Sequence, residues 1–107
     1  MNCPFPDDLD PRFEYFGMRV HGDRMNGLCI DDGDIITVCR QDEVEQGAIA
    51  VVLVNGEYAD VSRFYSSGTT VTLIPHSTNP EHKPHVYDRN ETTVRVLGKV
   101  KMVRKRL

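Results

Sequence analysis

The sequence predicts an all-β fold, and three patterns support this prediction. Apolar and polar residues alternate with a period of two over Tyr15–Val20, as in a strand with one buried face. Apolar or β-branched runs at 35–39 and 48–54 are typical of strands that are covered on both faces. Asn55-Gly56 follows the second run and favours a tight hairpin, because both residues accept the positive φ of a type I′ turn.

The remaining elements follow in order along the chain. The hairpin leads into a strand over 57–64, and a further strand is expected over 69–74. An irregular loop comes next, because three prolines interrupt any regular pattern there: Pro75, Pro80 and Pro84. The last predicted strand covers 92–103, with alternate apolar side chains on one face. Helical signals are nearly absent, and a short turn at 25–28 is the best candidate.

Composition indicates one small domain. A chain of 107 residues can bury one modest core. We expect an irregular arm or residual linker over 1–12 and a single domain over 13–107. No apolar stretch approaches the roughly 20 residues of a membrane span, and the N-terminus lacks the pattern of a secretory signal. The expected compartment is therefore the cytoplasm, without a membrane partner.

The cysteines and histidines give no strong site. Cys3, Cys29 and Cys39 show no C-x-x-C spacing, so we expect reduced thiols rather than a disulfide framework or a zinc site. Three histidines fall in the proline-rich segment, and His82-x-x-His85 has a spacing that metal sites use. Without an acidic or cysteine ligand in register, solvated loop histidines are the expected outcome, for His76 as well. We expect no metal ion and no cofactor.

The most informative motif is the tetrapeptide Gly22-Asp23-Arg24-Met25, which is followed by Asp32-Gly33-Asp34-Ile35. This stretch resembles the C-terminal domain of the LexA, UmuD and phage CI repressor family, where the pattern reads G-D-S-M, then a turn, then D-G-D and a hydrophobic residue. The resemblance covers roughly Phe13 to Val103. It implies a LexA/signal-peptidase-like fold of several coiled, mostly antiparallel sheets with an Asn-Gly hairpin.

The resemblance places two substitutions at the family's catalytic dyad. Arg24 stands where the family has its serine nucleophile, and Ser62 aligns with the lysine that deprotonates this serine. An arginine side chain stays protonated and is no nucleophile, and a serine hydroxyl is too weak a base to activate one. We therefore expect no active catalytic residue. If the alignment is right, the two positions lie close together across a cleft, with Arg24 exposed or paired with a carboxylate.

The leading hypothesis is a catalytically inactive LexA/CI-like domain, which acts as the dimerisation and regulatory protein-binding module of a transcriptional repressor. The resemblance implies a homodimer, and we expect the C-terminal strand near 94–103 to supply an unpaired edge for it. DNA would be read only by a separate helix-turn-helix domain that is not in this chain. Loss of the dyad would remove the RecA-stimulated switch, so an antirepressor or another regulatory protein would have to take its place.

Two alternatives remain open. The first is a Ser-Lys autopeptidase of the LexA/UmuD type whose dyad was mutated for crystallisation. The second is a UmuD′-like subunit of a damage-tolerance polymerase. Neither Ala-Gly nor Cys-Gly, the dipeptides at which the family cleaves itself, occurs in the chain. Their absence fits the second alternative, whereas the lost dyad does not.

Overall fold

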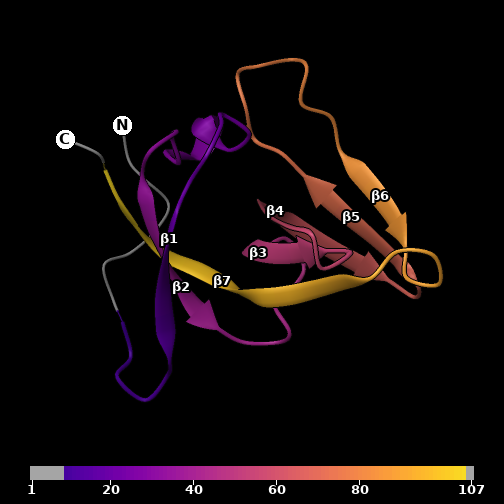
Figure 1. The fold of residues 1–107 in the computed structure, drawn as a ribbon, viewed down its shortest axis with the longest axis horizontal. Coiled ribbons are helices and arrows are strands. Elements are labelled where there is room, and N and C mark those ends of the chain that lie inside the picture. The colour runs from indigo at the N-terminus through magenta and orange to yellow at the C-terminus, as the bar shows by residue number, and fades with distance from the viewer. Residues whose placement is uncertain (1–8, 106–107) are drawn as a thin grey trace.

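The computed structural model describes residues 9–105, and in this range seven strands form one antiparallel sheet (Figure 1). The order across the sheet is β1-β2-β7-β3-β4-β5-β6. The strands are β1 Tyr15–Arg19, β2 Ile35–Arg40, β3 Ile49–Val54, β4 Tyr58–Ser67, β5 Thr70–Ile74, β6 His85–Asp88 and β7 Val94–Arg104. A 3₁₀ helix, Asn26–Leu28, lies where the sequence predicts a turn. The predicted all-β, mostly antiparallel fold is confirmed.

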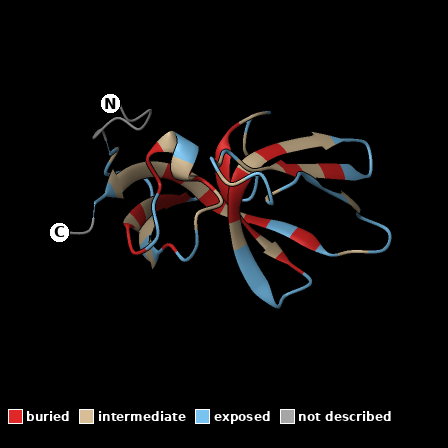
Figure 2. Cartoon of the chain, turned by 90° about the horizontal axis from the view of Figure 1, so that it is seen from above, coloured by how far each residue is buried: buried red, intermediate tan, exposed pale blue. Residues whose placement is uncertain are grey.

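The central strand β3 explains how one sheet carries two cores. Its alternate side chains point to opposite faces, so Ile49 and Val51 enter a first core with residues of β1, β2 and the β1–β2 connection. Ala50, Val52 and Val54 enter a second core with residues of β4, β5 and β7. Burial is therefore nearly continuous along β3, as its unbroken apolar run predicts. Figure 2 shows buried stretches in the middle of the molecule and on strands to both sides of it.

The sheet bends where β7 passes between β2 and β3. The register shifts between Thr37 and Val38 on one side and between Val51 and Val52 on the other, and such irregularities increase the local twist of a sheet. Gly98 pairs with both neighbouring strands at this point. A Cβ atom there would lie 2.6 Å from Cγ1 of Val38 and still closer to the carbonyl oxygen of Cys39. Only glycine fits between the strands at this bend.

The hairpin between β3 and β4 fixes the register that places the functional candidates. Asn55 and Gly56 both have positive φ, 54° and 67°, as the Asn-Gly pair predicts. The loop also includes the next residue, because Val54 pairs with Tyr58. In this register Ser62 lies opposite Ala50 and is completely buried. Because side chains alternate along a strand, Asp60 lies on the same face of β4 as Ser62.

Two sequence predictions about the strands are wrong. His85 does not lie in the irregular loop, because it begins β6, which pairs with β5. All three prolines of this segment precede His85, so the residues that follow can pair along the outer edge of β5. The last strand, β7, is not an unpaired edge, because it lies inside the sheet between β2 and β3. Its length allows its first half to pair with β3 and its second half with β2.

The predicted arm over 1–12 falls mostly outside the described residues, as does Cys3. Cys29 and Cys39 are buried in the first half of the domain. No helix within residues 9–105 is long and apolar enough to cross a membrane.

We expect Gly98→Ala to destabilise the fold by about 1–3 kcal/mol, or more if the strands must separate, because the added methyl group meets both neighbouring strands. Gly17→Ala is the matched control, since a Cβ atom there would approach no atom closer than 3.8 Å. Urea denaturation monitored by circular dichroism measures both variants. Equal stabilities for the two variants would contradict the proposed close approach at Gly98.

Candidate functional site

Arg24 and Ser62 are in direct contact. Arg24 lies in the turn that follows β1, and Ser62 lies in the middle of β4. The Nε–H group of Arg24 donates a hydrogen bond to Oγ of Ser62 at 2.9 Å. The structure thus brings together two positions that are 38 residues apart in the chain.

The guanidinium of Arg24 has two further oxygen partners. Oδ1 of Asp60 lies 3.3 Å from Nε, and the side chains of Arg24 and Asp60 are only 14% and 15% exposed. One terminal N–H group also donates to the carbonyl oxygen of Leu73 on β5, at 3.4 Å. The turn is therefore attached to both β4 and β5 through a single side chain. Ser62 and Asp60 both approach Nε, and a separate terminal nitrogen of the planar guanidinium reaches Leu73.

Burial changes the electrostatics of the Asp60 carboxyl. The loss of solvent around this carboxyl raises its pKa, and the positive charge of Arg24 opposes the rise without cancelling it. The raised pKa means that the charged form of Asp60 costs stability at neutral pH even with its partner present. The ion pair therefore does not by itself show a gain in folding stability. Loss of either partner alone would still destabilise the protein, because it would leave an uncompensated buried charge.

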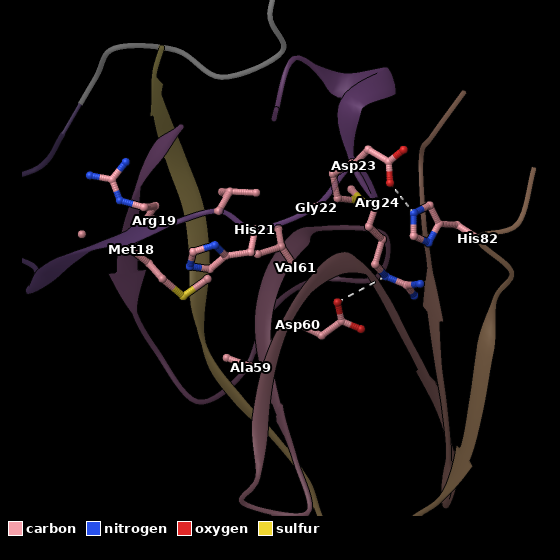
Figure 3. A pocket seen from close by; sticks show the side chains of 13 residues that line it. Met18, Arg19, His21, Gly22, Asp23, Arg24, Ala59, Asp60, Val61 and His82 are labelled. Carbon is pink, nitrogen blue, oxygen red and sulfur yellow. Dashed lines mark hydrogen bonds and ion pairs between the residues drawn. The ribbon is translucent and has the colours of Figure 1, made fainter. Parts of the chain in front are cut away.

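A cleft of about 660 Å³ runs beside this cluster (Figure 3). Residues 17–25 form one wall, residues 59–61 of β4 form the other, and His82 closes one end. The end near Arg24 is polar, whereas Met18, Val20 and Val61 make other parts of the lining apolar. β1 is an edge strand, and β5 pairs with β4 only from Arg63 onward. The cleft therefore lies between two strand segments that each have one side without a strand partner.

The Asp31–Asp34 turn supports the wall that carries Arg24. The backbone N–H of Gly22 donates to Oδ1 of Asp32 at 2.8 Å, and the backbone of Val20 pairs with that of Gly33 and Asp34. Nζ of Lys105 in turn bonds to the carboxylates of Asp31 and Asp34. The Asp-Gly-Asp motif thus holds the end of β1 and the Gly22 turn in place.

The histidines of the proline-rich segment do not gather at one point. Nε2 of His82 lies 2.6 Å from Oδ1 of Asp23, while His85 stacks edge-on against Tyr87 on β6. His76 contributes backbone hydrogen bonds to the turn around Arg24. Within residues 9–105, no group of three or more side chains is arranged to hold a metal ion.

Sequence reasoning missed Asp60 and the pairing of Asp23 with His82. A usable signal existed for Asp60, because it precedes Ser62 by two residues and must share its face of β4. No comparable signal existed for His82, which is 59 residues from its partner in the chain.

A turn residue and a strand residue of one antiparallel sheet meet beside a cleft, which is the arrangement that the resemblance to the LexA family implies. Comparison with known proteins shows the family. The model of the Peptidase S24-like family matches residues 1–101, and the chain belongs to this family.

The chain is also similar to several LexA repressors. It is 39% identical over 104 residues to that of Streptomyces avermitilis, a match that covers 97% of this chain and 42% of the relative. Identity is 35% over 86 residues with the LexA repressor of Pelagibacter ubique, covering 80% of this chain and 38% of the relative. For the LexA repressor of Acidothermus cellulolyticus, identity is 36% over 104 residues, covering 97% of this chain and 35% of the relative. The chain thus spans less than half the length of these relatives.

We predict that Arg24→Met destabilises the protein by about 3 kcal/mol at neutral pH, because it leaves the buried carboxylate of Asp60 without its partner. The loss should shrink toward about pH 4, where an unpaired Asp60 can be protonated in the folded state. Urea denaturation at both pH values measures the effect. Arg12→Met is the control, because the Arg12 side chain is 82% exposed and its ion pair with Asp10 lies at the surface. A loss that does not depend on pH would contradict the role assigned to Asp60.

Proposed function

We propose that this chain is a catalytically inactive LexA-like domain, which serves as the dimerisation and regulatory protein-binding module of a transcriptional repressor. The contact between Arg24 and Ser62 carries this proposal, because the resemblance aligns these two positions with the family's catalytic dyad. The similarity to LexA repressors supports the link to transcription. The rest of the argument concerns what these two side chains can and cannot do.

Neither side chain can take a role in a serine-lysine mechanism. The nucleophile must be a hydroxyl or thiol within reach of a base, and the guanidinium of Arg24 offers neither. The hydroxyl of Ser62 accepts a hydrogen bond from Arg24, and a guanidinium stays protonated at any physiological pH. Arg24 therefore cannot remove the proton of Ser62 and turn it into a substitute nucleophile. The pair is suited to holding the turn against the sheet.

A domain without a nucleophile can still bind other proteins. The cleft lies between the free side of β1 and the part of β4 that β5 does not reach, so an extended segment of a regulatory protein could pair with backbone groups there. The polar end near Arg24, Asp60 and His82 would then determine which segments fit. Since self-cleavage is excluded in this proposal, binding of an antirepressor would be the event that relieves repression.

Dimerisation follows from the role of a repressor, since two DNA-binding domains must be held on a two-fold operator. Within residues 9–105 the helical structure is limited to Asn26–Leu28, so a helix-turn-helix would have to come from elsewhere. The second half of β7, residues 100–104, pairs with β2 on one side, whereas its pairing with β3 ends at Lys99. This half-open segment is our candidate for the contact between two copies.

The wild-type chain should show no self-cleavage after prolonged incubation at alkaline pH, as measured by intact mass. Combining Arg24→Ser with Ser62→Lys restores the dyad at positions that are already in contact, so this double variant should cleave a peptide with an Ala-Gly bond as its lysine deprotonates. Each single substitution should stay inactive, because the two residues act as a unit.

Two results would count against the inactive assignment. A specific clipped product from the wild-type chain, lost when one serine is replaced, would favour an autopeptidase. A double variant that folds and remains inactive would show that positions 24 and 62 do not account for the missing activity.

Sedimentation velocity at micromolar concentration should find a homodimer. Lys101→Glu should weaken it at least about tenfold, because a two-fold contact at residues 100–104 brings both reversed charges to the interface. Arg95→Glu changes the net charge equally but lies on the half of β7 that pairs with β3, and it should leave the dimer unchanged. Lys99 is unsuitable for this test, because it pairs with Glu45 of its own chain. A folded protein that stays monomeric would contradict the proposed dimerisation role.

A further inference from the structure

The loop over residues 75–84, which joins β5 to β6, folds back onto the turn that carries Arg24. In Figure 1 this loop and the β1–β2 connection stand at the same end of the molecule. The N–H of Gly27 donates to the carbonyl oxygen of His76 at 2.8 Å, and the N–H of His76 donates to that of Arg24 at 3.1 Å. A Cβ atom at position 27 would lie 3.0 Å from the carbonyl oxygen of His76. The glycine therefore allows the loop and the turn to approach closely.

Neutral side chains add to this contact. The side-chain amide of Asn26 donates to Oγ1 of Thr78 at 3.1 Å and accepts the backbone N–H of Thr78 at 2.9 Å. The hydroxyl of Ser77 donates to the carbonyl oxygen of Asp23 at 2.7 Å. None of these bonds depends on a side chain that titrates near neutral pH. These hydrogen bonds hold the loop to the turn independently of pH near neutrality.

One contact between loop and turn does involve two ionisable side chains. Nε2 of His82 meets Oδ1 of Asp23 at 2.6 Å, and the other carboxylate oxygen of Asp23 accepts a bond from Asn79 at 3.3 Å. Across the described part of the chain, no other ion pair joins this loop to the turn. His82 is also the loop residue that lines the cleft, next to Asp23 and Arg24 (Figure 3).

We propose that Asp23 and His82 form a proton-controlled latch, which fixes the 75–84 loop to the Arg24 turn and so sets the wall of the cleft at its polar end. This inference goes beyond the proposed function and holds whether or not the domain is active. Opening the latch would move His82 away from the cleft and would loosen the turn that positions Arg24. The cleft would then differ in shape between the two protonation states of the same protein.

The charges around the latch come from three elements. Arg24 lies beside Asp23 on the turn, and Asp60 on β4 interacts electrostatically with Arg24, His82 and His85 of β6. Thus a change of charge on His82 is felt by the Arg24–Asp60 pair as well as by Asp23. The effect of replacing His82 must be separated from the electrostatic effect of His85 on Asp60, which is why His85 supplies the control below.

The direction of the pH dependence follows from the contacts. The hydrogen bond from His82 lowers the pKa of the Asp23 carboxyl, so the stability that the carboxylate gives is present above its unfolded pKa and is lost as pH falls through the lowered value. The latch is therefore weakened when the Asp23 carboxylate takes up a proton.

Amide hydrogen exchange of the full chain, corrected for intrinsic rates, tests the latch at Gly27 and Thr78. His82→Ala should reduce the protection of both amides about fivefold near pH 6, in line with a partly exposed ion pair. Wild-type protection should also fall as pH drops through the lowered pKa of the Asp23 carboxyl, because the carboxylate then loses its charge. Asp23→Asn has no titrating group at this position, so its protection should not depend on pH over that range.

His85→Gln should behave as wild type, and the buried amide of Val52 serves as the reference for global stability. The carboxyl ¹³C signal of Asp23 should titrate at higher pH in His82→Ala than in wild type. Protection within twofold of wild type in His82→Ala would overturn the proposal. So would a wild-type pH profile that persists in Asp23→Asn.

Discussion

A nearly buried guanidinium can be held only where oxygen atoms surround it, and this requirement organises the centre of the molecule. Arg24 satisfies it with the hydroxyl of Ser62, the carboxylate of Asp60 and the carbonyl of Leu73. These oxygens come from β4 and β5, whereas Arg24 comes from the turn after β1. The side chain therefore joins the two parts of the sheet across the cleft. Without such partners, desolvation of the charge would oppose folding by several kcal/mol.

The same contact links stability to the proposed loss of activity. In a serine-lysine site the turn and the strand meet through a nucleophile and its base, and both must remain reactive. Here they meet through a permanently charged donor and an acceptor. The scaffold keeps its cleft and its attachment of the turn to the sheet. We propose that what remains is a surface for association and regulation.

The sequence predicted those features that depend on local patterns. Alternation and apolar runs located the strands, and the two positive φ values at Asn55 and Gly56 followed from their residue types. The pairing of Arg24 with Ser62 could be anticipated only through the family pattern, because 38 residues separate them. The seven-strand order could not be read from the chain, and this is why β7 was wrongly expected at an edge. β6 was missed because prolines and histidines gave its surroundings the composition of a loop.

The sequence does not allow contacts between side chains of distant segments to be predicted. Strand alternation could predict which face of β4 carries Asp60. It could not predict the partner of Asp60, because the sequence does not show where the turn lies relative to β4. The pairing of His82 with Asp23 depends on how the 75–84 loop folds back, and no local pattern encodes that. Both missed contacts surround Arg24, so the least predictable contacts of the chain lie at the candidate site.

The Nε–H proton of Arg24 offers the most direct test of this account, because a guanidinium N–H that is hydrogen-bonded and shielded from solvent exchanges slowly with water. In an NMR spectrum near neutral pH, we expect a protected Nε–H signal from Arg24 with a nuclear Overhauser contact to the β protons of Ser62. The corresponding proton of Arg12, whose side chain is 82% exposed, should exchange rapidly. Equal exchange rates for the two arginines, without a contact to Ser62, would contradict the view that Arg24 and Ser62 hold the turn against β4.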